Sequence, residues 1–370
     1  MEYKKYKLKE LLTIKNGKDH KKLAEGDYPV YGSGGYMRSV NSFLYGRKSI
    51  LLPRKGTLSN IQYVSGHPFW TVDTIYYTVL NEKLYDPYYL YLYLNSLDLS
   101  GYDSGASIPS MTSKTYYSLN IELPEKKIQT KVANIIRAYE NLIENNNKRI
   151  KLLEKMAENQ YKEWFVRFRF PGYKNVEFEE KKPRGWQVGK DDKKHFAPTI
   201  FKYDELRNIG SFIRGKNITT AKMIEGDIPV ISAGLQPSGY HNEANVYGAS
   251  LTISASGANA GYLQYHMKDI WAADCSYYQD DATIWFVYNT LKYLQPVISN
   301  LQCGAAQPHV YPKNINRLCI LIPPEELIHK YNDYVMPYYD EIKILNKHNQ
   351  LLTKQRKMLL PRLMSGKLEM

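Results

Sequence analysis

An internal repeat constrains this chain more than any other feature of its sequence. Residues 25–30 (EGDYPV) recur as residues 225–230 (EGDIPV). Further matched landmarks keep the same order and nearly the same spacing: Asn16-Gly17-Lys18 with Arg214-Gly215-Lys216, Gly56 with Gly257, Trp70 and Asp73 with Trp271 and Asp274, Gly105-Ala106 and Pro109 with Gly304-Ala305 and Pro308, and residues 119–124 with 318–323. Chance does not preserve so many landmarks in order, so the chain contains two copies of one folding unit.

Each copy begins with a mixed α/β segment. Short apolar runs bounded by Gly and Pro predict strands at residues 49–52 and 250–254. Short helices are expected after Pro87 and around Leu291, and the remainder is loop-rich. With 370 residues, of which 43% are hydrophobic, the chain is long enough for two or three compact domains.

A long helix is expected at the end of each copy. Apolar residues after Pro124 recur in alternating steps of four and three, which is the coiled-coil heptad pattern. The positions of this seam are Val132, Ile136, Tyr139, Ile143, Asn146, Ile150, Leu153, Ala157, Gln160 and Trp164. After Pro323 the same rhythm gives Tyr331, Val335, Tyr338, Ile342, Leu345, Asn349 and Leu352. We expect Pro337 to start or kink the second helix. Because such helices must bury their seams, we expect them to pair with each other, antiparallel.

The predicted fold class is therefore α+β. Two tandem α/β units are each followed by a long helix, and the helices pack as an antiparallel coiled coil with pseudo-two-fold symmetry. The expected boundaries are 1–124 for the first unit, 125–169 for the central helix, 170–189 for a linker rich in Pro, Gly and charge, 190–323 for the second unit and 324–370 for the C-terminal helix.

The chain is basic, with a formal net charge of +13 and a pI near 9.2. A basic excess of this size favours a polyanionic partner, most commonly nucleic acid, over a protein that is merely rich in lysine. Residues 126–169 carry 11 Lys and Arg against five Glu, and residues 341–370 carry seven against two. We therefore expect the helices to hold most of the net charge. That charge fits helices that contact DNA phosphates or an acidic partner, and equally the solvated face of a coiled coil.

The sequence shows no complete catalytic or metal-binding motif. Residues 86–89 (DPYY) lack the second Pro of the adenine methyltransferase signature and indicate a helix start, and residues 32–35 (GSGG) lack the Lys of a phosphate loop and indicate a turn. The three Cys and eight His show no ligand spacing. Asp73 and Asp274 could form a split catalytic pair, but a structural role within each unit is favoured. No apolar leader or membrane span is recognised, so we expect a cytoplasmic protein.

Three matched loops in each unit carry the side chains that read base edges. In the first unit they are Lys15, Asn16 and Lys18, then Arg54, Lys55 and Thr57, then Ser107 and Lys114. In the second unit they are Arg214, Lys216 and Asn217, then Ser254, Ser256 and Asn259, then Gln307, His309 and Lys313. The nearby Gly17, Gly56, Gly215 and Gly257 either admit a phosphate close to the backbone or mark tight turns. The second loops differ most, as expected of modules that read different half-sites.

Several features together resemble the specificity subunit of type I restriction–modification systems. They are the tandem layout, the GDxPV turn, the GA-x-x-P stretch before L-x-I-x-L-P, the long Asn-rich helix and the ending at residues 359–368 (LLPRLMSGKL). The resemblance covers almost the whole chain. It implies two target-recognition domains, each reading one half of a split, asymmetric site in double-stranded DNA. It also implies two conserved helices that act as a spacer and as the docking platform for two methyltransferase subunits, with room for restriction subunits in the complex.

The same resemblance implies that the chain is a non-catalytic subunit that binds no cofactor. The methyltransferase subunits would bind S-adenosylmethionine and methylate adenine N6, and a restriction subunit, where present, would bind ATP. Three alternatives stay open: a specificity subunit of a methyltransferase-only or type II-like system, a self-contained nucleic-acid enzyme, and a coiled-coil scaffold without a DNA role. The recognised bases do not follow from the sequence, because direct readout depends on loop geometry.

Overall fold

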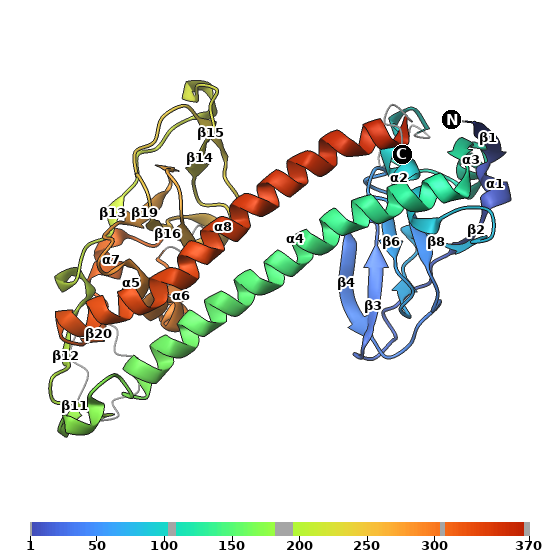
Figure 1. The fold of residues 1–370 in the computed structure, drawn as a ribbon. Coiled ribbons are helices and arrows are strands. Elements are labelled where there is room, and N and C mark those ends of the chain that lie inside the picture. Colours follow the sequence, from blue (N-terminus) through green and yellow to red (C-terminus); the bar gives the residue numbers. More distant parts are fainter. Residues whose placement is uncertain (1, 103–108, 182–194, 304–307, 366–370) are drawn as a thin grey trace. The chain divides into compact units, whose positions relative to one another are not determined.

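The computed structural model describes residues 2–102, 109–181, 195–303 and 308–365. The chain forms two compact units, which we call the first unit (Met1–Asn145 with Asn349–Met370) and the second unit (Asn146–His348). Figure 1 shows that each unit contains a body of strands and short helices together with part of each long helix. The two units are described separately below.

The first unit contains three sheets. Its strands are β1 (Tyr3–Lys7), β2 (Leu12–Asn16), β3 (Tyr28–Gly32), β4 (Gly35–Val40), β5 (Ser49–Pro53), β6 (Gln62–Val64), β7 (Trp70–Thr71), β8 (Ile75–Leu80) and β9 (Asn120–Pro124). They pair in the orders β2-β8-β5-β6, β4-β3-β7 and β1-β9. The short helices are α1 (Leu8–Leu11), α2 (Pro87–Ser96) and α3 (Ser113–Ser118), with a 3-10 turn at Ser100–Tyr102. The expected strand at 49–52 and the expected helix after Pro87 are confirmed.

The second unit repeats this topology strand for strand. Its strands are β12 (Lys202–Glu205), β13 (Ile213–Arg214), β14 (Ile228–Ile231), β15 (Gly239–His241), β16 (Ser250–Ser254), β17 (Leu263–His266), β18 (Trp271–Ala272), β19 (Cys275–Tyr278) and β20 (Cys319–Ile322). Their orders are β13-β19-β16-β17, β15-β14-β18 and β12-β20, and the short helices are α5 (Ile284–Tyr293), α6 (Gln295–Ser299) and α7 (Pro312–Asn316). The repeat deduced from sequence landmarks is thus a repeat of structure, and the tandem α+β fold is confirmed.

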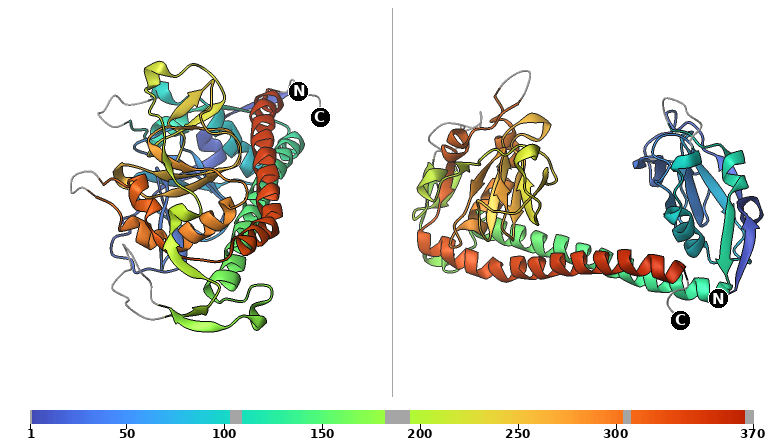
Figure 2. Two further views of the ribbon diagram at one scale, coloured as in Figure 1. Left: turned by 90° about the vertical axis from the view of Figure 1, so that its left-hand side faces the viewer. Right: turned by 90° about the horizontal axis from the view of Figure 1, so that it is seen from above.

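The two long helices, α4 (Lys126–Tyr161) and α8 (Glu325–Met364), run antiparallel within each unit. In the second unit the Tyr331 hydroxyl donates to the Ala157 carbonyl at 3.0 Å, and Arg149 pairs with Glu341 at 2.6 Å. The later residue of α4 thus contacts the earlier residue of α8, as expected for antiparallel helices. In the first unit Arg356 pairs with Glu140 at 3.1 Å. The views in Figures 1 and 2 agree on this pairing inside each unit.

The predicted seam is accurate, but it is not buried by the partner helix alone. Every predicted seam residue from Val132 to Trp164 and from Tyr331 to Leu352 is buried or half-buried. In the second unit Tyr339 stacks on Trp285 of α5, with ring centroids 3.5 Å apart, and in the first unit Val132 and Ile136 join the core that contains Tyr89 of α2. Each helix therefore buries apolar surface against the body of its unit as well as against the other helix.

One expectation about the helices was wrong in part, and a second was wrong. Helix α8 begins at Glu325 and runs through Pro337, which is exposed on its surface, so Pro337 does not start it. Because α8 includes an acidic first half, it carries seven Lys and Arg against five Asp and Glu, and α4 carries eight against four. The helices therefore hold less than half of the net charge of +13. Acidic residues in the first turn of α8 are favourable because they face the positive end of the helix dipole.

The segment predicted as a linker contains a strand. Residues of β10 (Phe178–Lys181) pair antiparallel with β11 (His195–Pro198), and the rings of Phe178 and Phe196 stack 6.5 Å apart. Lys181 donates to the Phe201 carbonyl at 2.6 Å. Helix α4 ends at Tyr161 and is followed by a π-helical turn, Lys162–Val166, rather than continuing to residue 169. None of the described helices is both long and apolar enough to cross a bilayer.

Candidate nucleic-acid interface

The second and third predicted loops of each unit lie side by side. In the first unit Gly56 N donates to the Pro109 carbonyl at 2.9 Å, and Met111 N donates to the Arg54 carbonyl at 3.0 Å. In the second unit Gly257 N donates to the Pro308 carbonyl at 3.1 Å, and Val310 N to the Ala255 carbonyl at 2.9 Å. Isolated β-bridges join the same loops, Lys55 with Ser110 and Ser256 with His309. The two units therefore use one backbone frame to bring these loops together.

The first loop joins this frame through the matched Trp. Trp70 donates its indole N–H to the Lys18 carbonyl at 2.8 Å, and Trp271 donates to the Lys216 carbonyl at the same distance of 2.8 Å. The main-chain oxygen of Thr74, in the turn after Trp70, accepts from Arg54 N at 2.9 Å, which ties this turn to the second loop. We call the resulting cluster the loop edge. It comprises residues 15–18, 53–57, 70–74 and 109–114 in the first unit, and 214–217, 254–259, 271–274 and 308–313 in the second.

The matched glycines have local structural causes. A Cβ atom at Gly17 would lie 2.0 Å from the Val72 carbonyl oxygen, and one at Gly215 would lie 2.5 Å from the Ala273 oxygen. Both glycines therefore allow two main-chain segments to approach closely. Gly56 and Gly257 have φ values of 90° and 75°, in the left-handed region that favours glycine. Tight turns thus account for these glycines without a bound phosphate.

The side chain of Asp274 has contacts inside its own unit, in agreement with the structural role that the sequence favoured. The Asp274 carboxylate pairs with Arg214 and accepts a hydrogen bond from the Ser256 hydroxyl. Asp73 is exposed, and its main-chain oxygen accepts from Arg54 Nη1 at 3.5 Å.

The predicted DNA-contacting residues differ in accessibility. Ten of them are exposed on the loop edges: Lys15, Asn16, Lys18, Lys55, Thr57, Lys114, Arg214, Lys216, Asn217 and Lys313. Arg54, Asn259 and His309 are half-buried. Ser254 and Ser256 are buried, and the Ser254 hydroxyl donates to the Ala233 carbonyl at 3.1 Å, so both serines have partners inside the unit. Ser107 and Gln307 lie outside the described residues.

A hollow that the sequence did not predict lies beside the loop edge of the first unit. Asn60 and Gln62 hold the turn at residues 32–35 by donating to the carbonyls of Ser33 and Gly32, at 2.6 and 2.9 Å. This turn lines a cavity of about 630 Å³ together with Asp19–Lys21 and Asp73. The only sequence signal was the basic run DHKK after Lys18, which has no counterpart in the second unit.

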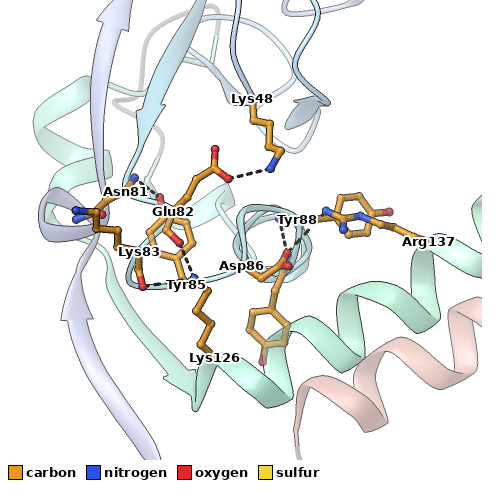
Figure 3. Close-up of polar contacts among 10 residues, drawn as sticks. Lys48, Asn81, Glu82, Lys83, Tyr85, Asp86, Tyr88, Lys126 and Arg137 are labelled. Atoms are coloured by element: carbon orange, nitrogen blue, oxygen red, sulfur yellow. Dashed lines mark hydrogen bonds and ion pairs between the residues drawn. The ribbon is translucent and has the colours of Figure 1, made fainter.

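The first unit is attached to α4 by a polar cluster, shown in Figure 3. Asp86 caps α2 by accepting from Tyr88 N at 2.9 Å and lies 3.8 Å from Arg137 of α4. The Arg137 guanidinium lies 4.5 Å from the Tyr88 ring centroid, a cation–π contact, and Lys126 donates to the Glu82 carbonyl at 2.7 Å. The DPYY sequence is thus a capped helix start, as expected.

The described residues contain no group of three or more His, Cys, Asp or Glu that could hold a metal ion. Burial raises the pKa of the Cys275 thiol to about 12, so this thiol is protonated near neutral pH and is a poor nucleophile. Burial also lowers the pKa of His266 to about 4, and its ring lies 2.8 Å from the Thr252 hydroxyl. What the loop edges offer instead is exposed cationic and amide groups on a fixed backbone.

Comparison with known proteins places the chain in one family. The sequence matches the family of the type I restriction modification DNA specificity domain over residues 1–155 and 199–354. The MjaIX type I restriction enzyme specificity subunit of Methanocaldococcus jannaschii is 26% identical, over 76% of this chain and 68% of that protein. The HindI specificity subunit of Haemophilus influenzae is 21% identical, over 78% and 79%. A type I S subunit from M. genitalium has the same fold, with a TM-score of 0.64 at 18% identity over 98% and 96% of the two chains. The chain therefore belongs to the specificity subunits of type I restriction–modification systems, with one DNA specificity domain in each repeat.

Proposed function

We propose that this chain gives a type I restriction–modification complex its DNA specificity, and that each loop edge reads one half of a bipartite, asymmetric site. The observation that carries the proposal is the shared backbone frame of the two loop edges combined with their different side chains. Arg54 and Lys55 stand where the second unit has Ala255 and Ser256. Because base edges are read by side-chain donors and acceptors, such a pair of edges is suited to two different half-sites.

The proposal predicts that substitutions in the two units act on different half-sites. Arg54→Ala should reduce discrimination in one half-site, and Arg214→Ala in the other, each by about 5- to 150-fold at the affected base. The measurement is binding of the subunit, assembled with its methyltransferase subunits, to a library of duplexes. Arg207→Ala is the matched control, because Arg207 pairs with Glu205 outside the loop edge. If either loop-edge variant altered both half-sites alike, the division between the units would be refuted.

We further propose that methyltransferase subunits dock on the paired helices. In the second unit Leu152 and Met156 of α4 and Tyr334 and Ile344 of α8 are between 48% and 63% exposed. Each immediately precedes a seam residue, as do Arg149 and Glu341, which pair across the helices at 2.6 Å. The four apolar side chains therefore follow the same flank of the helix pair. Exposed apolar groups gathered in this way are typical of protein–protein interfaces.

The docking proposal predicts a specific loss of assembly. Replacing Leu152 and Ile344 together by Lys should weaken binding of the methyltransferase subunit by at least tenfold while leaving thermal unfolding nearly unchanged, because both side chains are already exposed. Asn346→Lys is the control, since Asn346 is exposed but directly follows a seam residue and so lies on the other flank. Sedimentation of the mixed subunits measures the effect, and unchanged assembly of the double variant would rule out this face.

Catalysis is assigned to the partner chains in this proposal. The methyltransferase subunits would bind S-adenosylmethionine and methylate adenine N6, and a restriction subunit, where present, would use ATP. The purified chain alone should transfer no methyl group from labelled S-adenosylmethionine, and activity of the isolated chain would revive the enzyme alternative.

A coiled-coil scaffold without a DNA role predicts DNA affinity that barely changes with salt, whereas phosphate contacts give a steep decrease of affinity as salt rises. A methyltransferase-only assembly would be recognised by methylation without DNA cleavage.

A further inference from the structure

We propose that Asp274 is a positioning residue that holds the Arg214 guanidinium for a guanine in the second half-site. This inference rests on the proposed function and names the base that the second unit reads at one position. It assigns to the matched Asp274 a role in specificity, in addition to its local structural contacts.

The contacts of Arg214 define its orientation. Arg214 is the last residue of β13, opposite Ser276 of β19, and its Nη2 atom pairs with Asp274 Oδ1. The other carboxylate oxygen, Oδ2, accepts from the Ser256 hydroxyl. The Arg214 side chain is 42% exposed and that of Asp274 29%, so the ion pair lies at the surface and leaves part of the guanidinium accessible.

The main chain that carries the Asp274 carboxylate is held by hydrogen bonds. Ala273 N donates to the Ile231 carbonyl at 2.8 Å, and the Asp274 carbonyl accepts from Ala255 N at 3.3 Å. Gly215 N, directly after Arg214, donates to the Cys275 carbonyl at 2.9 Å. These bonds connect the segments that carry Arg214, Ser256 and Asp274, so the three side chains have little freedom relative to one another. A side chain held in this way loses less entropy on binding.

The chemistry of this triad suits a base edge better than a phosphate. A guanidinium has five N–H donors, and Asp274 uses only part of them, which leaves donors for the O6 and N7 atoms of guanine. A guanidinium fork can also bind a phosphate, but the affinity of that contact depends on net positive charge, and the adjacent carboxylate would weaken the attraction for an anion. The Asp274–Arg214 ion pair has no net charge, but it fixes the orientation of the guanidinium, and direct readout of a base requires a fixed orientation.

The first unit shows that the fold does not require the triad. Asn16 lies opposite Tyr76 of β8, at the position that Arg214 occupies opposite Ser276. Lys55 stands in place of Ser256, and the matched Asp73 is exposed. The two units nevertheless share the same sheet orders and the same Trp-to-carbonyl bond. The shared frame thus forms without an Arg–Asp–Ser triad in the first unit, and the exposed Arg214 points to a role of the triad in binding.

The test measures base preference and salt dependence of the assembled complex on duplexes that vary each base of the second half-site. Arg214→Ala and Arg214→Lys should both reduce the preference for guanine at one position by about 5- to 150-fold, because lysine cannot form the forked contact. Arg214→Lys should keep the wild-type dependence of affinity on salt, since the positive charge remains. Asp274→Asn, which keeps the side-chain volume, should reduce the same preference, and Ser256→Ala should do so less. Glu205→Gln is the control, as Glu205 pairs with Arg207 and is also 29% exposed.

A transplant keeps the inference testable if Asp274→Asn unfolds the second unit. The Thr74 carbonyl accepts from Arg54 N as the Asp274 carbonyl accepts from Ala255 N, so Thr74 occupies the place of Asp274 in the frame. Asn16→Arg combined with Lys55→Ser and Thr74→Asp therefore recreates the triad and should add a guanine preference at one position of the first half-site. The inference is overturned if Arg214→Lys keeps the discrimination of the wild-type complex, if the base whose preference changes is not guanine, or if the transplant adds no guanine preference. All of these outcomes presuppose two half-sites for the wild-type complex; a wild-type complex without them would instead refute the proposed function.

Discussion

Replacing Tyr331 by alanine is expected to lower the free energy of unfolding of the second unit by about 3–5 kcal/mol, the range for a large aromatic side chain removed from a core. Tyr331 of α8 is fully buried and packs against Trp164 and Phe165, with ring centroids 5.8 and 5.1 Å away. Its hydroxyl donates to the Ala157 carbonyl of α4 at 3.0 Å. The substitution would therefore leave a cavity and remove a hydrogen bond between the two helices where they meet the body of the unit.

Urea denaturation of the full chain measures this loss. Tyr240→Ala is the matched control, because Tyr240 lies in β15 of the same unit and is 55% exposed. The control should change the free energy of unfolding by less than about 0.5 kcal/mol. If Tyr331→Ala were as mild as the control, the helices would not be part of the core of the second unit.

Gly17→Ala is expected to destabilise the first unit by about 3 kcal/mol, at the upper end of the usual cost of overpacking. The added Cβ would lie 2.0 Å from the Val72 carbonyl oxygen and 2.6 Å from that of Thr71, and neither main-chain group can move aside as a side chain could. The shift would break the bond from Lys18 N to the Thr71 carbonyl, 2.8 Å long, which fixes the first loop. Reading of one half-site should therefore weaken along with stability.

Gly34→Ala provides a control of identical chemistry. An added Cβ at Gly34 meets nothing within 4 Å, and its φ is not in the left-handed region, so this variant should be as stable as the wild type or slightly more stable. Thermal unfolding of both variants, followed by duplex binding, separates loss of folding from loss of readout. Equal stability of Gly17→Ala and wild type would mean that the first loop does not lie against β7 and the turn that follows it.

Sequence landmarks predicted the repeat and the helix seams because both depend on local periodicity and on positions that tolerate few residues. The heptad steps identify Val132, Ile136, Ile342 and Leu345 correctly, since burial of one helix face requires apolar residues at those steps. Trp70 and Trp271 match in the sequence because the same indole-to-carbonyl hydrogen bond is made at both positions, which favours Trp in each unit.

Other features depend on contacts between distant segments and left no local signal. The sequence cannot distinguish the exposed Thr57 from the buried Ser256, because only the turn at Asp274 decides where the Ser256 hydroxyl points. The packing of Tyr339 on Trp285 was not predicted for the same reason. The heptad pattern shows which face of a helix is buried, but not which element covers that face. Pro337 was expected to start or kink the second helix because proline lacks an N–H and disfavours a helix interior. Helix α8 begins twelve residues earlier, at Glu325, and runs through Pro337, which is exposed.

The division of labour between the two repeats is tested most directly by sequencing modified adenines in the DNA of cells that express this chain with its methyltransferase subunits. We predict methylation at a single split motif with two unlike halves, which disappears when the gene for this chain is deleted. Arg54→Ala should alter one half of that motif and Arg214→Ala the other. A continuous motif, or methylation that is unchanged after the deletion, would contradict the claim that each repeat reads one half-site.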